Sequence, residues 1–488
     1  MSSADQRIPL LTTTRPVARG ESVREGAKES GGEHTLAFAG LVMFTLLLYL
    51  RPNEMFPGLF GTFPIIKIVA ILALVTYAAS RLAEGQKLTF WPLELKMLGA
   101  IILLGLIHIP IAQSPQDSFD VLTDNLLKIV CIFVLMINLI DTRARLRLFF
   151  KVVVICGGVL AVFAIRSYVM GEFGLKGPRI WGVVGGMFGN PNDLATSFDL
   201  LLPLGVFLAL TSRGPARAFY LIVCGLLVTG VVLTFSRSGF LGLLTLAAVM
   251  LWKMGRDSRA LTVTVFIILL GVFTVAAPQG YSARLLSMFN IESDPTGSAQ
   301  LRRDQLDRAF DMAVSRPVIG VGLGNYHIYA LREQRAHNSY LEISAELGVA
   351  GLIAYLILLF APLRALARIE RETTQKTPAR AAARSHRAAR STDEAPGNRE
   401  YRYMSISLQA SLAAYLVCSF FASLQYQWYL YYLIAYAIAL GKLYEAAALG
   451  ANPEGAAKER QKVKGVAWRK SRRLAVPQAA GGELPYSD

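Results

Sequence analysis

A histidine in the C-terminal half of the chain has the setting that proton chemistry requires. His337 begins the segment His337-Asn338-Ser339-Tyr340-Leu341, which leads from a long polar region into an apolar one. Ser339 and Glu342 have the spacing of a capping box, so a helix is expected to start at Asn338 or Ser339. The positive end of that helix disfavours a protonated imidazole and favours the neutral form, which can accept a proton. The pattern therefore indicates a general base, and a histidine bonded to a loop carbonyl is the alternative.

Two arginines have the chemistry that a phosphate ligand requires. Arg237 lies in Thr234-Phe235-Ser236-Arg237-Ser238-Gly239, between two apolar runs, and Arg179 lies in a glycine-rich loop before Asn190-Pro191-Asn192. A guanidinium group stays charged and bonds phosphate oxygens in pairs, which suits the growing charge of a pyrophosphate leaving group. Each arginine also has a structural interpretation, Arg237 as a side chain that reaches interfacial water and Arg179 as an ordinary loop residue.

Other polar residues near these positions could support such a site. Glu346 lies one helical turn after Glu342 in an expected membrane span, where a carboxylate usually faces a cavity or a basic partner. Asn338 directly follows the histidine. Further external cations, which the sequence does not rank, are Arg284, Arg302, Arg303 and Arg316.

Two patterns that might suggest a cofactor or a metal are better explained otherwise. Gly320-Val-Gly322-Leu-Gly324 has part of a nucleotide-loop spacing, but it follows no strand of a βαβ unit, so a tight turn after Arg316-Pro317 is expected instead. Asp304, Asp307 and Asp311 alternate with arginines and are expected to be ion-paired. The 4 cysteines are scattered within apolar runs, so neither disulfide bonds nor a metal site is expected.

The elements that would position these residues are transmembrane helices. The chain of 488 residues is 53% hydrophobic and only 17% charged, whereas soluble domains average about 25% charged residues. Apolar runs long enough to cross a bilayer predict an all-α, polytopic membrane protein with about twelve spans. The expected spans are 35–50, 64–80, 97–112, 121–140, 149–170, 194–211, 218–235, 238–252, 261–277, 338–361, 404–423 and 427–446.

The distribution of lysine and arginine predicts which ends of these spans face the cytoplasm. The arginines of 143–147, the basic segment 364–402 and the C-terminal tail all fall on one set of alternate connections. Because cytoplasmic loops carry the excess of positive charge, both termini are expected in the cytoplasm and the candidate histidine and arginines at the periplasmic side. The net charge of +16 is accordingly attributed to contacts with anionic lipid rather than with nucleic acid.

This topology divides the chain into five parts. They are a disordered cytoplasmic tail 1–34, transmembrane helices one to nine in 35–278, a large periplasmic loop 279–337 with helices, transmembrane helices ten to twelve in 338–446 with a basic cytoplasmic loop 362–403, and a cytoplasmic tail 447–488. Within the periplasmic loop, residues 299–315 are expected to form an amphipathic helix with Leu306, Phe310 and Ala313 on one face. That helix is expected either on the membrane surface or packed on the other external loop, 171–193.

Together the motifs resemble the O-antigen ligase and O-antigen polymerase superfamily of bacterial inner membranes. Thr234 to Gly239 with Leu241 is similar to the family's Arg-x-x-x-Leu element. Pro317-Val-Ile-Gly320-Val-Gly322, followed by His337-Asn338 and Gly348-x-x-Gly351, is similar to its histidine element. The loop of Arg179 with Asn190-Pro191-Asn192 resembles the upstream arginine loop.

The resemblance implies a helical glycosyltransferase of C-type architecture that uses neither a metal nor another cofactor. It would move a glycan from undecaprenyl pyrophosphate to a sugar hydroxyl of the lipid A core, at the periplasmic face of the inner membrane, in lipopolysaccharide biosynthesis. Arg179 and Arg237 would hold the diphosphate, His337 would activate the acceptor hydroxyl, and direct attack would invert the anomeric carbon. Membrane lipids are expected partners, and nucleic acid is not.

Two kinds of alternative remain open. With the same fold, the chain would be a polysaccharide polymerase if it extended another lipid-linked repeat, or a protein O-oligosaccharyltransferase if it glycosylated Ser or Thr. A secondary transporter would instead use Lys67, Lys128 and Arg166 as charges within a cavity. The lack of an obvious internal repeat argues against a transporter built from inverted repeats.

Overall fold

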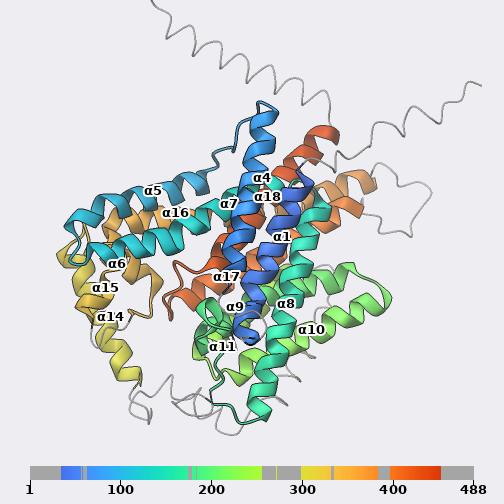
Figure 1. Ribbon diagram of the computed structural model, residues 1–488. Coiled ribbons are helices and arrows are strands. Elements are labelled where there is room, and N and C mark those ends of the chain that lie inside the picture. The colour runs from blue at the N-terminus through green and yellow to red at the C-terminus, as the bar shows by residue number, and fades with distance from the viewer. Residues whose placement is uncertain are drawn as a thin grey trace, which may run out of the picture.

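Helices make up all the regular secondary structure in the part of the chain that the structure describes (Figure 1). The structure is a computed structural model that describes residues 34–56, 58, 63–173, 179–182, 184–254, 267, 271, 298–330, 335–382 and 396–451. The longer helices are α1 (Thr35–Leu50), α4 (Ile65–Ala83), α5 (Leu93–His108), α7 (Leu127–Leu139), α8 (Arg143–Val169), α9 (Pro191–Thr211), α10 (Gly214–Leu233), α11 (Arg237–Met254), α14 (Ser298–Ser315), α16 (Ser339–Ala382), α17 (Pro396–Ser419) and α18 (Trp428–Ala451). The short ones are α2 (Pro52–Met55), η2 (Ile109–Ile111), α6 (Pro115–Asp120), the π-helical turn η3 (Val121–Leu126), η4 (Gly186–Phe188) and α15 (Tyr326–Tyr329).

Among the described residues, 8 helices are long and apolar enough to cross a membrane, judged by length and composition alone. They comprise α1, α4, α5, α8, α9, α10, α11 and the part of α16 that ends at Thr374. Helices α7, α17 and α18 lie where three further spans were predicted. The predicted span 261–277 lies outside the described residues except for Ile267 and Gly271. The polytopic all-α fold is therefore confirmed, while the count of twelve spans stays a prediction.

Helix α9 lies at the centre of the bundle. Every residue from Leu194 to Ala209 is buried, and the helix packs against α8, α10, α11 and α17. Polar residues in the middle of α9, such as Asp199, would be unfavourable against lipid, so burial by neighbouring helices suits this helix. The bundle therefore shields α9 from lipid and leaves its two ends to carry polar groups.

The two ends of α9 meet different sets of charged residues. At its C-terminus, Arg147 donates a hydrogen bond from Nη2 to the carbonyl of Thr211 (3.3 Å) and pairs with Glu400 at 3.1 Å. Its N-terminus adjoins the loop of Arg179. The 21 residues of α9 separate these ends by about 30 Å, which matches the hydrocarbon core of a bilayer. The basic cluster of 143–147 and the candidate site thus lie at opposite ends of the bundle, and their assignment to cytoplasm and periplasm stays a prediction.

Helix α16 is broken at Gly348, whose φ is 67° and ψ is −168°. A break of this kind leaves helical N–H and C=O groups without their usual partners. The glycine-rich segment 317–322 supplies partners through three backbone hydrogen bonds: from Val321 N to Ala345 O (2.8 Å), from Gly322 N to Glu346 O (3.0 Å) and from Val349 N to Pro317 O (2.8 Å). The segment therefore acts as a splint across the break, and this splint sets the direction of the short first part of α16, residues 339–347.

The tight turn expected after Arg316-Pro317 is present, because the N–H of Gly320 donates to the carbonyl of Arg316 at 2.9 Å. The buried Asn325 then anchors the segment to α6. Its Oδ1 accepts from the N–H of Ser114 at 2.7 Å, and its Nδ2 donates to Ser118 Oγ at 2.8 Å. Figure 1 shows the result, with α5, α6, α14, α15 and α16 grouped on one side of the molecule.

The amphipathic helix expected at 299–315 is α14, but a different face of it is buried. Gln305 and Ala309 are fully buried, whereas Phe310 is 59% exposed. Tyr326 of α15 packs against this buried face and donates from its hydroxyl to the carbonyl of Gln305 at 3.0 Å. Burial raises the pKa of Tyr326, so the hydroxyl stays a neutral donor. α14 packs on α16, while its two expected positions, on the membrane surface or against the loop 171–193, stay predictions.

Beyond the expected span 338–361, α16 remains helical to Ala382, and α17 starts at Pro396. Leu366 and Ile369 in this extension are buried, and Glu370 pairs with Lys253 at 2.6 Å. The first part of the expected basic loop 362–403 is therefore packed helix. Residues 383–395 and most of the two predicted tails lie outside the described residues.

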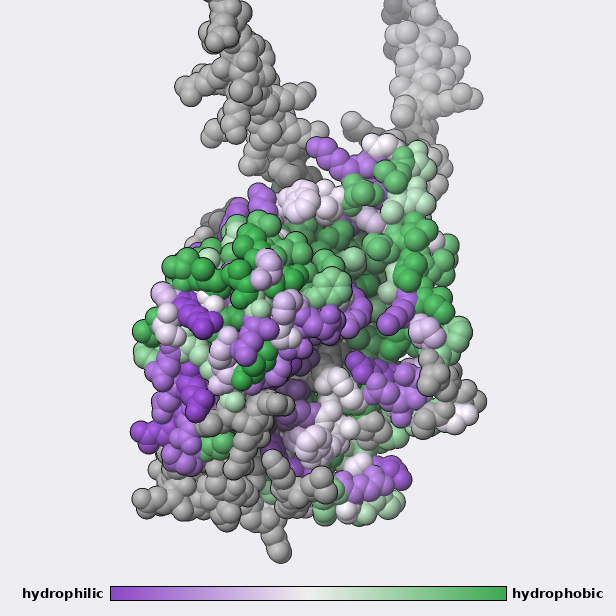
Figure 2. Space-filling view, turned by 60° about the vertical axis from the view of Figure 1, so that its left-hand side comes forward, coloured by the Kyte–Doolittle hydropathy of each residue, from purple (hydrophilic) through white to green (hydrophobic). Residues whose placement is uncertain are grey.

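Apolar side chains cover much of the outside of the bundle. Figure 2 shows hydrophobic residues gathered in a band on the face that includes α5, with hydrophilic residues below that band. Leu103, Leu106 and Ile107 of α5 are each about half exposed. A soluble protein rarely exposes so large an apolar surface, so this band is the surface that lipid would cover.

Candidate active site

Arg179 is joined to the N-terminus of α9 and to the turn before α11. Its Nη2 donates to Asn192 Oδ1 at 2.8 Å, and its Nε donates to the carbonyl of Thr234 at 3.2 Å. Ser236 donates from Oγ to the same Asn192 oxygen at 3.0 Å. The buried Asn192 therefore holds the two arginine-bearing loops of the sequence motifs together, although 55 residues separate Arg179 from Thr234.

The turn that carries Arg237 has an unusual backbone. Phe235 has a φ of 54°, in the left-handed region that residues other than glycine seldom adopt. This turn lets Ser236 cap α11, because Ser236 Oγ accepts from the N–H of Gly239 at 3.2 Å. Arg237 is the first residue of α11 and is half-buried. The guanidinium group thus starts at a helix N-terminus, where the positive end of the helix dipole also favours an anion.

His337 also has a left-handed backbone, with a φ of 52°, and is half-buried just before the first residue of α16. The predicted capping residue is Asn338, whose Oδ1 accepts from the N–H groups of Tyr340 and Leu341, both at 3.0 Å. Ser339 has a different role from the one expected, since its Oγ donates to the carbonyl of Ala422 at 2.8 Å. The cap fixes the backbone beside the imidazole.

Two buried carboxylates follow on the first part of α16. Glu342 accepts from the N–H of Ala336 at 3.1 Å and from Gln425 Nε2 at 2.8 Å, and it also bonds Ser423. Its bond to Ala336 closes the loop that contains His337. Glu346 accepts from the hydroxyl of Tyr426 at 2.8 Å.

Arg335 lies in the histidine segment and is exposed. Its charge is near enough to the carboxylates of Asp193 and Glu346 for an electrostatic attraction. Asp193 is the neighbour of Asn192, which bonds Arg179. The N-terminus of α9 therefore lies between the two arginine-bearing loops on one side and the 335–338 segment on the other.

This arrangement brings most of the predicted site residues to one end of the bundle. Helices α9, α11 and α16 all begin there, so their positive ends face the same region. Arg179, Arg237, His337, Asn338 and Glu346 belong to this group. The structure places cations, a histidine and helix N-termini together, which is an arrangement suited to an anionic substrate whose reaction includes a proton transfer.

Arg316 is placed differently from the other predicted residues. It is exposed, its guanidinium lies 5.5 Å from the centre of the Tyr329 ring, and Nη1 donates to the Tyr329 hydroxyl at 3.5 Å. These contacts tie it to α15. The other external histidine, His327, contacts the carbonyl of Gly324 at 2.9 Å and Asp117 at 3.5 Å, so its bonds support the packing of α15 on α6.

Some residues of this region were not singled out from the sequence. They are Asn192 as a bridge, Arg335, and the polar residues Ser423, Gln425 and Tyr426 between α17 and α18. A signal was present for the last three, because buried carboxylates at membrane depth need polar partners, and Ser423-Leu424-Gln425-Tyr426 is a polar run between two expected spans. Among the described residues, no group of three or more His, Cys, Asp or Glu side chains is arranged to hold a metal ion.

Comparison with known proteins gives a match over the middle of the chain. Residues 221–356 match a family model described as O-antigen ligase. The matched residues include the turn of Arg237, the glycine-rich splint and His337, whereas Arg179 lies before them. No curated protein matches the chain. Members of the matched family are glycosyltransferase-like ligases and polymerases, and the family implies lipid-linked glycan substrates.

Proposed function

We propose, from the membership of the chain in the O-antigen ligase superfamily, that it transfers a glycan from undecaprenyl pyrophosphate to a sugar hydroxyl of lipid A-core. The reaction would take place at the periplasmic face of a bacterial inner membrane, with a C-type glycosyltransferase architecture and without a metal. The observation that carries the proposal is the position of the α9 N-terminus, where Asn192 accepts hydrogen bonds both from Arg179 and from Ser236, the neighbour of Arg237.

The proposed donor site consists of Arg179 and Arg237. Asn192 and Thr234 orient the first guanidinium at 2.8 and 3.2 Å, and the second starts at the N-terminus of α11. When the bond from the anomeric carbon to the diphosphate oxygen breaks, its electron pair goes to that oxygen. Two guanidinium groups and two helix N-termini would stabilise the charge that develops there.

His337 is the proposed general base. The acceptor hydroxyl would give its proton to the neutral imidazole while its oxygen attacks the anomeric carbon from the side opposite the diphosphate. This path inverts the anomeric configuration. Asn338 caps α16 beside the imidazole, and Glu342 binds the backbone of Ala336, so the two residues support the loop from both sides. Glu346 would support this site through Arg335, and Arg316 would act only by holding α15.

The direct test is a transfer assay with purified His337→Ala protein, lipid-linked donor and lipid A-core acceptor. Loss of the base is expected to lower the transfer rate by roughly 100-fold to 10,000-fold. His327→Ala is the matched control, because this histidine lies in the same external region but bonds Gly324 and Asp117, and it should keep nearly normal transfer. Normal transfer by the His337→Ala protein would remove the histidine from the mechanism.

The acceptor decides between the ligase and its nearest alternatives. Incubating the protein with donor and, in turn, lipid A-core, a second lipid-linked repeat and a peptide rich in Ser and Thr separates a ligase from a polymerase and from a protein O-oligosaccharyltransferase. Product on lipid A-core alone is the expected result. Product on either of the other acceptors alone would replace the ligase assignment while leaving the donor chemistry intact.

In the described part of the chain, the charges named for a transporter do not lie in a cavity. Lys128 pairs with Asp124, and Arg166 pairs with Glu172 at 3.2 Å, with the side chains of both pairs at least two-fifths exposed. Lys67 is exposed as well. These positions are on the outside of the helices, whereas a transporter would need the charges inside a cavity.

A further inference from the structure

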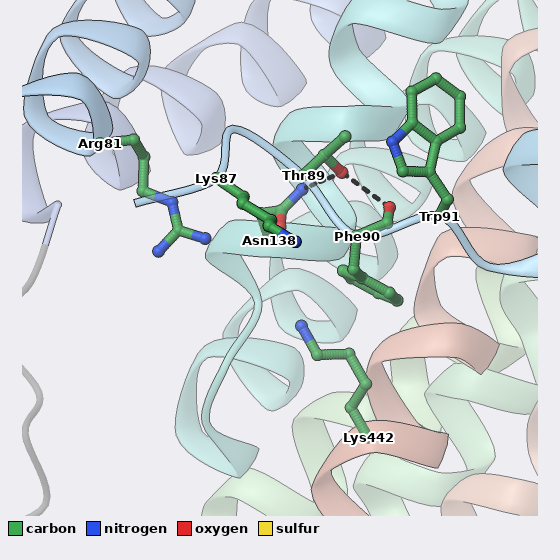
Figure 3. A pocket seen from close by; sticks show the side chains of 7 residues that line it. All are labelled: Arg81, Lys87, Thr89, Phe90, Trp91, Asn138 and Lys442. Carbon is green, nitrogen blue, oxygen red and sulfur yellow. Dashed lines mark hydrogen bonds between the residues drawn. The ribbon is translucent and has the colours of Figure 1, made fainter. Parts of the chain in front are cut away.

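A basic pocket lies at the end of the bundle opposite the candidate active site. It has a volume of about 500 Å³ and lies between the C-terminal ends of α4 and α7, the loop before α5, and α18. Figure 3 shows the Arg81 and Lys442 side chains approaching from two sides of the pocket, with the Phe90 ring above the Lys442 amine and the Trp91 ring pointing away from it. The opposite placement follows from α1. Its N-terminal cap His34 contacts Ser80 of α4, whereas α2, which follows its C-terminal end, meets the loop of the candidate site, where the N–H of Gly185 donates to Glu54.

The charge of this pocket is strongly positive. Arg81, Lys87 and Lys442 line it, and none of its 7 lining residues is acidic. Arg81 and Lys442 are close enough for their charges to repel. Asp141 attracts Lys442, but it already pairs with Arg145 at 2.9 Å. An anion bound between the cations would relieve this repulsion.

The cations are held in place with hydrogen-bonding capacity remaining. Lys442 donates from Nζ to the carbonyl of Ile137 at 3.0 Å and lies 4.2 Å from the centre of the Phe90 ring. That bond uses one of the three donors of an ammonium group. Arg81 donates from Nη1 to Gln86, which leaves further N–H groups of its guanidinium for a ligand. Asn138 donates to Thr89 at 2.9 Å and fixes the loop above the cations.

Exposed apolar residues adjoin the pocket and define its rim. Trp91 lines the pocket and is 63% exposed, and Leu82, Leu88 and Leu93 lie within two residues of lining residues in the sequence and are 45–65% exposed. Tryptophan at such a position is typical of the boundary between lipid headgroups and acyl chains. A ligand that enters past this rim would place a negative group among the cations and a hydrocarbon part on the leucines and the tryptophan.

We propose that this pocket binds the phosphate group of an anionic phospholipid of the leaflet on that side, which is the side expected to be cytoplasmic. The phosphate would lie between Arg81, Lys87 and Lys442, with the guanidinium providing paired N–H donors. The acyl chains would lie along the rim of leucines and Trp91. Phosphate is also available from solution, and the apolar rim is the feature that favours the lipid.

The test uses the full chain in bilayers of phosphatidylcholine with and without phosphatidylglycerol. Native mass spectrometry then measures how strongly each protein retains one lipid over the other. The unchanged protein should prefer phosphatidylglycerol by roughly 100-fold, because each of the three basic residues contributes a factor of about five. Lys87→Gln alone should reduce the preference about fivefold, and Arg81→Gln with Lys442→Gln should reduce it about 25-fold.

The matched control is Arg213→Gln with Arg217→Gln, two cations of the same expected side that do not line the pocket. This control should keep the full preference. Lys442 also donates to the carbonyl of Ile137 at the end of α7, so its replacement removes a bond within the fold as well as a cation. Lys87 is exposed, so Lys87→Gln tests the loss of a cation without that loss of a structural bond. Unchanged retention in the Lys87→Gln and double variants would overturn the site. A second measurement compares unfolding temperatures. If inorganic phosphate added in phosphatidylcholine alone raises the unfolding temperature as much as phosphatidylglycerol does, the lipid is not the source of the phosphate.

Discussion

Replacing Gly348 by alanine should separate the two parts of α16 from the segment that joins them. The backbone of Gly348, with φ 67° and ψ −168°, lies in a region that is essentially restricted to glycine, and a side chain there costs about 1–3 kcal/mol. A Cβ atom would also lie 2.6 Å from the carbonyl oxygens of Pro317 and Val318. Both atoms belong to the backbone and cannot rotate away, so the splint itself must move.

The size of the effect follows from what the movement breaks. The bond from the N–H of Val349 to Pro317 would be lost first, at a net cost of about 0.5–1.5 kcal/mol. Together with the backbone strain this gives about 3 kcal/mol. It corresponds to roughly a 100-fold rise in the fraction of molecules in which the segment 317–322 is detached from α16. Because the splint orients residues 339–347, Glu342 and the loop of His337 should lose their fixed position at the same time.

Hydrogen exchange with mass spectrometry measures this directly. In Gly348→Ala protein, the amides of Val321, Gly322 and Val349 should exchange roughly 100-fold faster than in the unchanged protein, and glycan transfer should fall. Gly99→Ala in α5 is the control, because nothing lies within 4 Å of an added Cβ there and alanine stabilises a helix by about 1 kcal/mol over glycine. If the three amides stay protected in Gly348→Ala protein, the splint does not depend on the break, and this reasoning is wrong.

Three further predictions concern single polar side chains. Asn192→Ala removes the acceptor shared by Arg179 and Ser236. The apparent affinity for the lipid-linked donor should fall roughly 10-fold to 150-fold in a transfer assay, by the 1.5–3 kcal/mol of a bond to a charged group, and unchanged donor affinity would contradict the bridge. Tyr426→Phe removes the hydroxyl that donates to the buried Glu346. A denaturant titration should show the protein destabilised by about 1–3 kcal/mol. Unchanged stability of this variant would mean that the carboxyl group of Glu346 has another donor. Asn325→Ala breaks the hydrogen bonds to Ser114 and Ser118 at α6 and should cost about 3 kcal/mol of stability. The measurement is the unfolding temperature, which should fall. An unchanged unfolding temperature would refute the role of Asn325 as an anchor.

The sequence predicted the helices better than their bends. Length and hydropathy are properties of continuous segments, and they located α1, α4, α8, α9 and α10 within a few residues in most cases. The break in α16 depends on hydrogen bonds to a segment about 25 residues earlier, so no local pattern reports it. The glycines of both motifs were visible in the sequence, yet the contact between them comes only from the fold.

The buried face of α14 shows another limit of pattern reasoning. Leu306, Phe310 and Ala313 share one helical face, but the structure buries Gln305 and Ala309 instead. Tyr326 decides the outcome, because its hydroxyl bonds the Gln305 carbonyl and its ring packs on Ala309. A helix beside a membrane has lipid available for its apolar face, so periodicity alone does not say which face meets protein.

For the candidate site, the sequence provided the reactive residue types and missed the residues that connect them. His337, Arg179 and Arg237 were singled out by their chemistry and their place at the ends of apolar runs. Asn192 bonds two of these segments together, and Arg335 brings a charge near the carboxylates of Asp193 and Glu346. Neither residue has a spacing that reveals its partner. Contacts between residues so distant in sequence depend on the packing of α9, α11 and α16, which hydropathy does not describe.

The positions of Phe235 and His337 give a physical reason why the candidate site lies where helices begin. Both residues have left-handed backbones, which are unfavourable by roughly 1–2 kcal/mol for residues other than glycine. Such backbones persist only where the surroundings fix them, and here Asn338 and Glu342 bond the chain on both sides of His337. In the apolar part of a membrane protein, every broken turn of helix needs polar partners. The hydrogen bonds that satisfy the backbone at these breaks are therefore the same ones that position the arginine and histidine side chains. Gly348 and Gly320 should consequently behave as site residues in a transfer assay, although neither has a side chain that could touch a substrate.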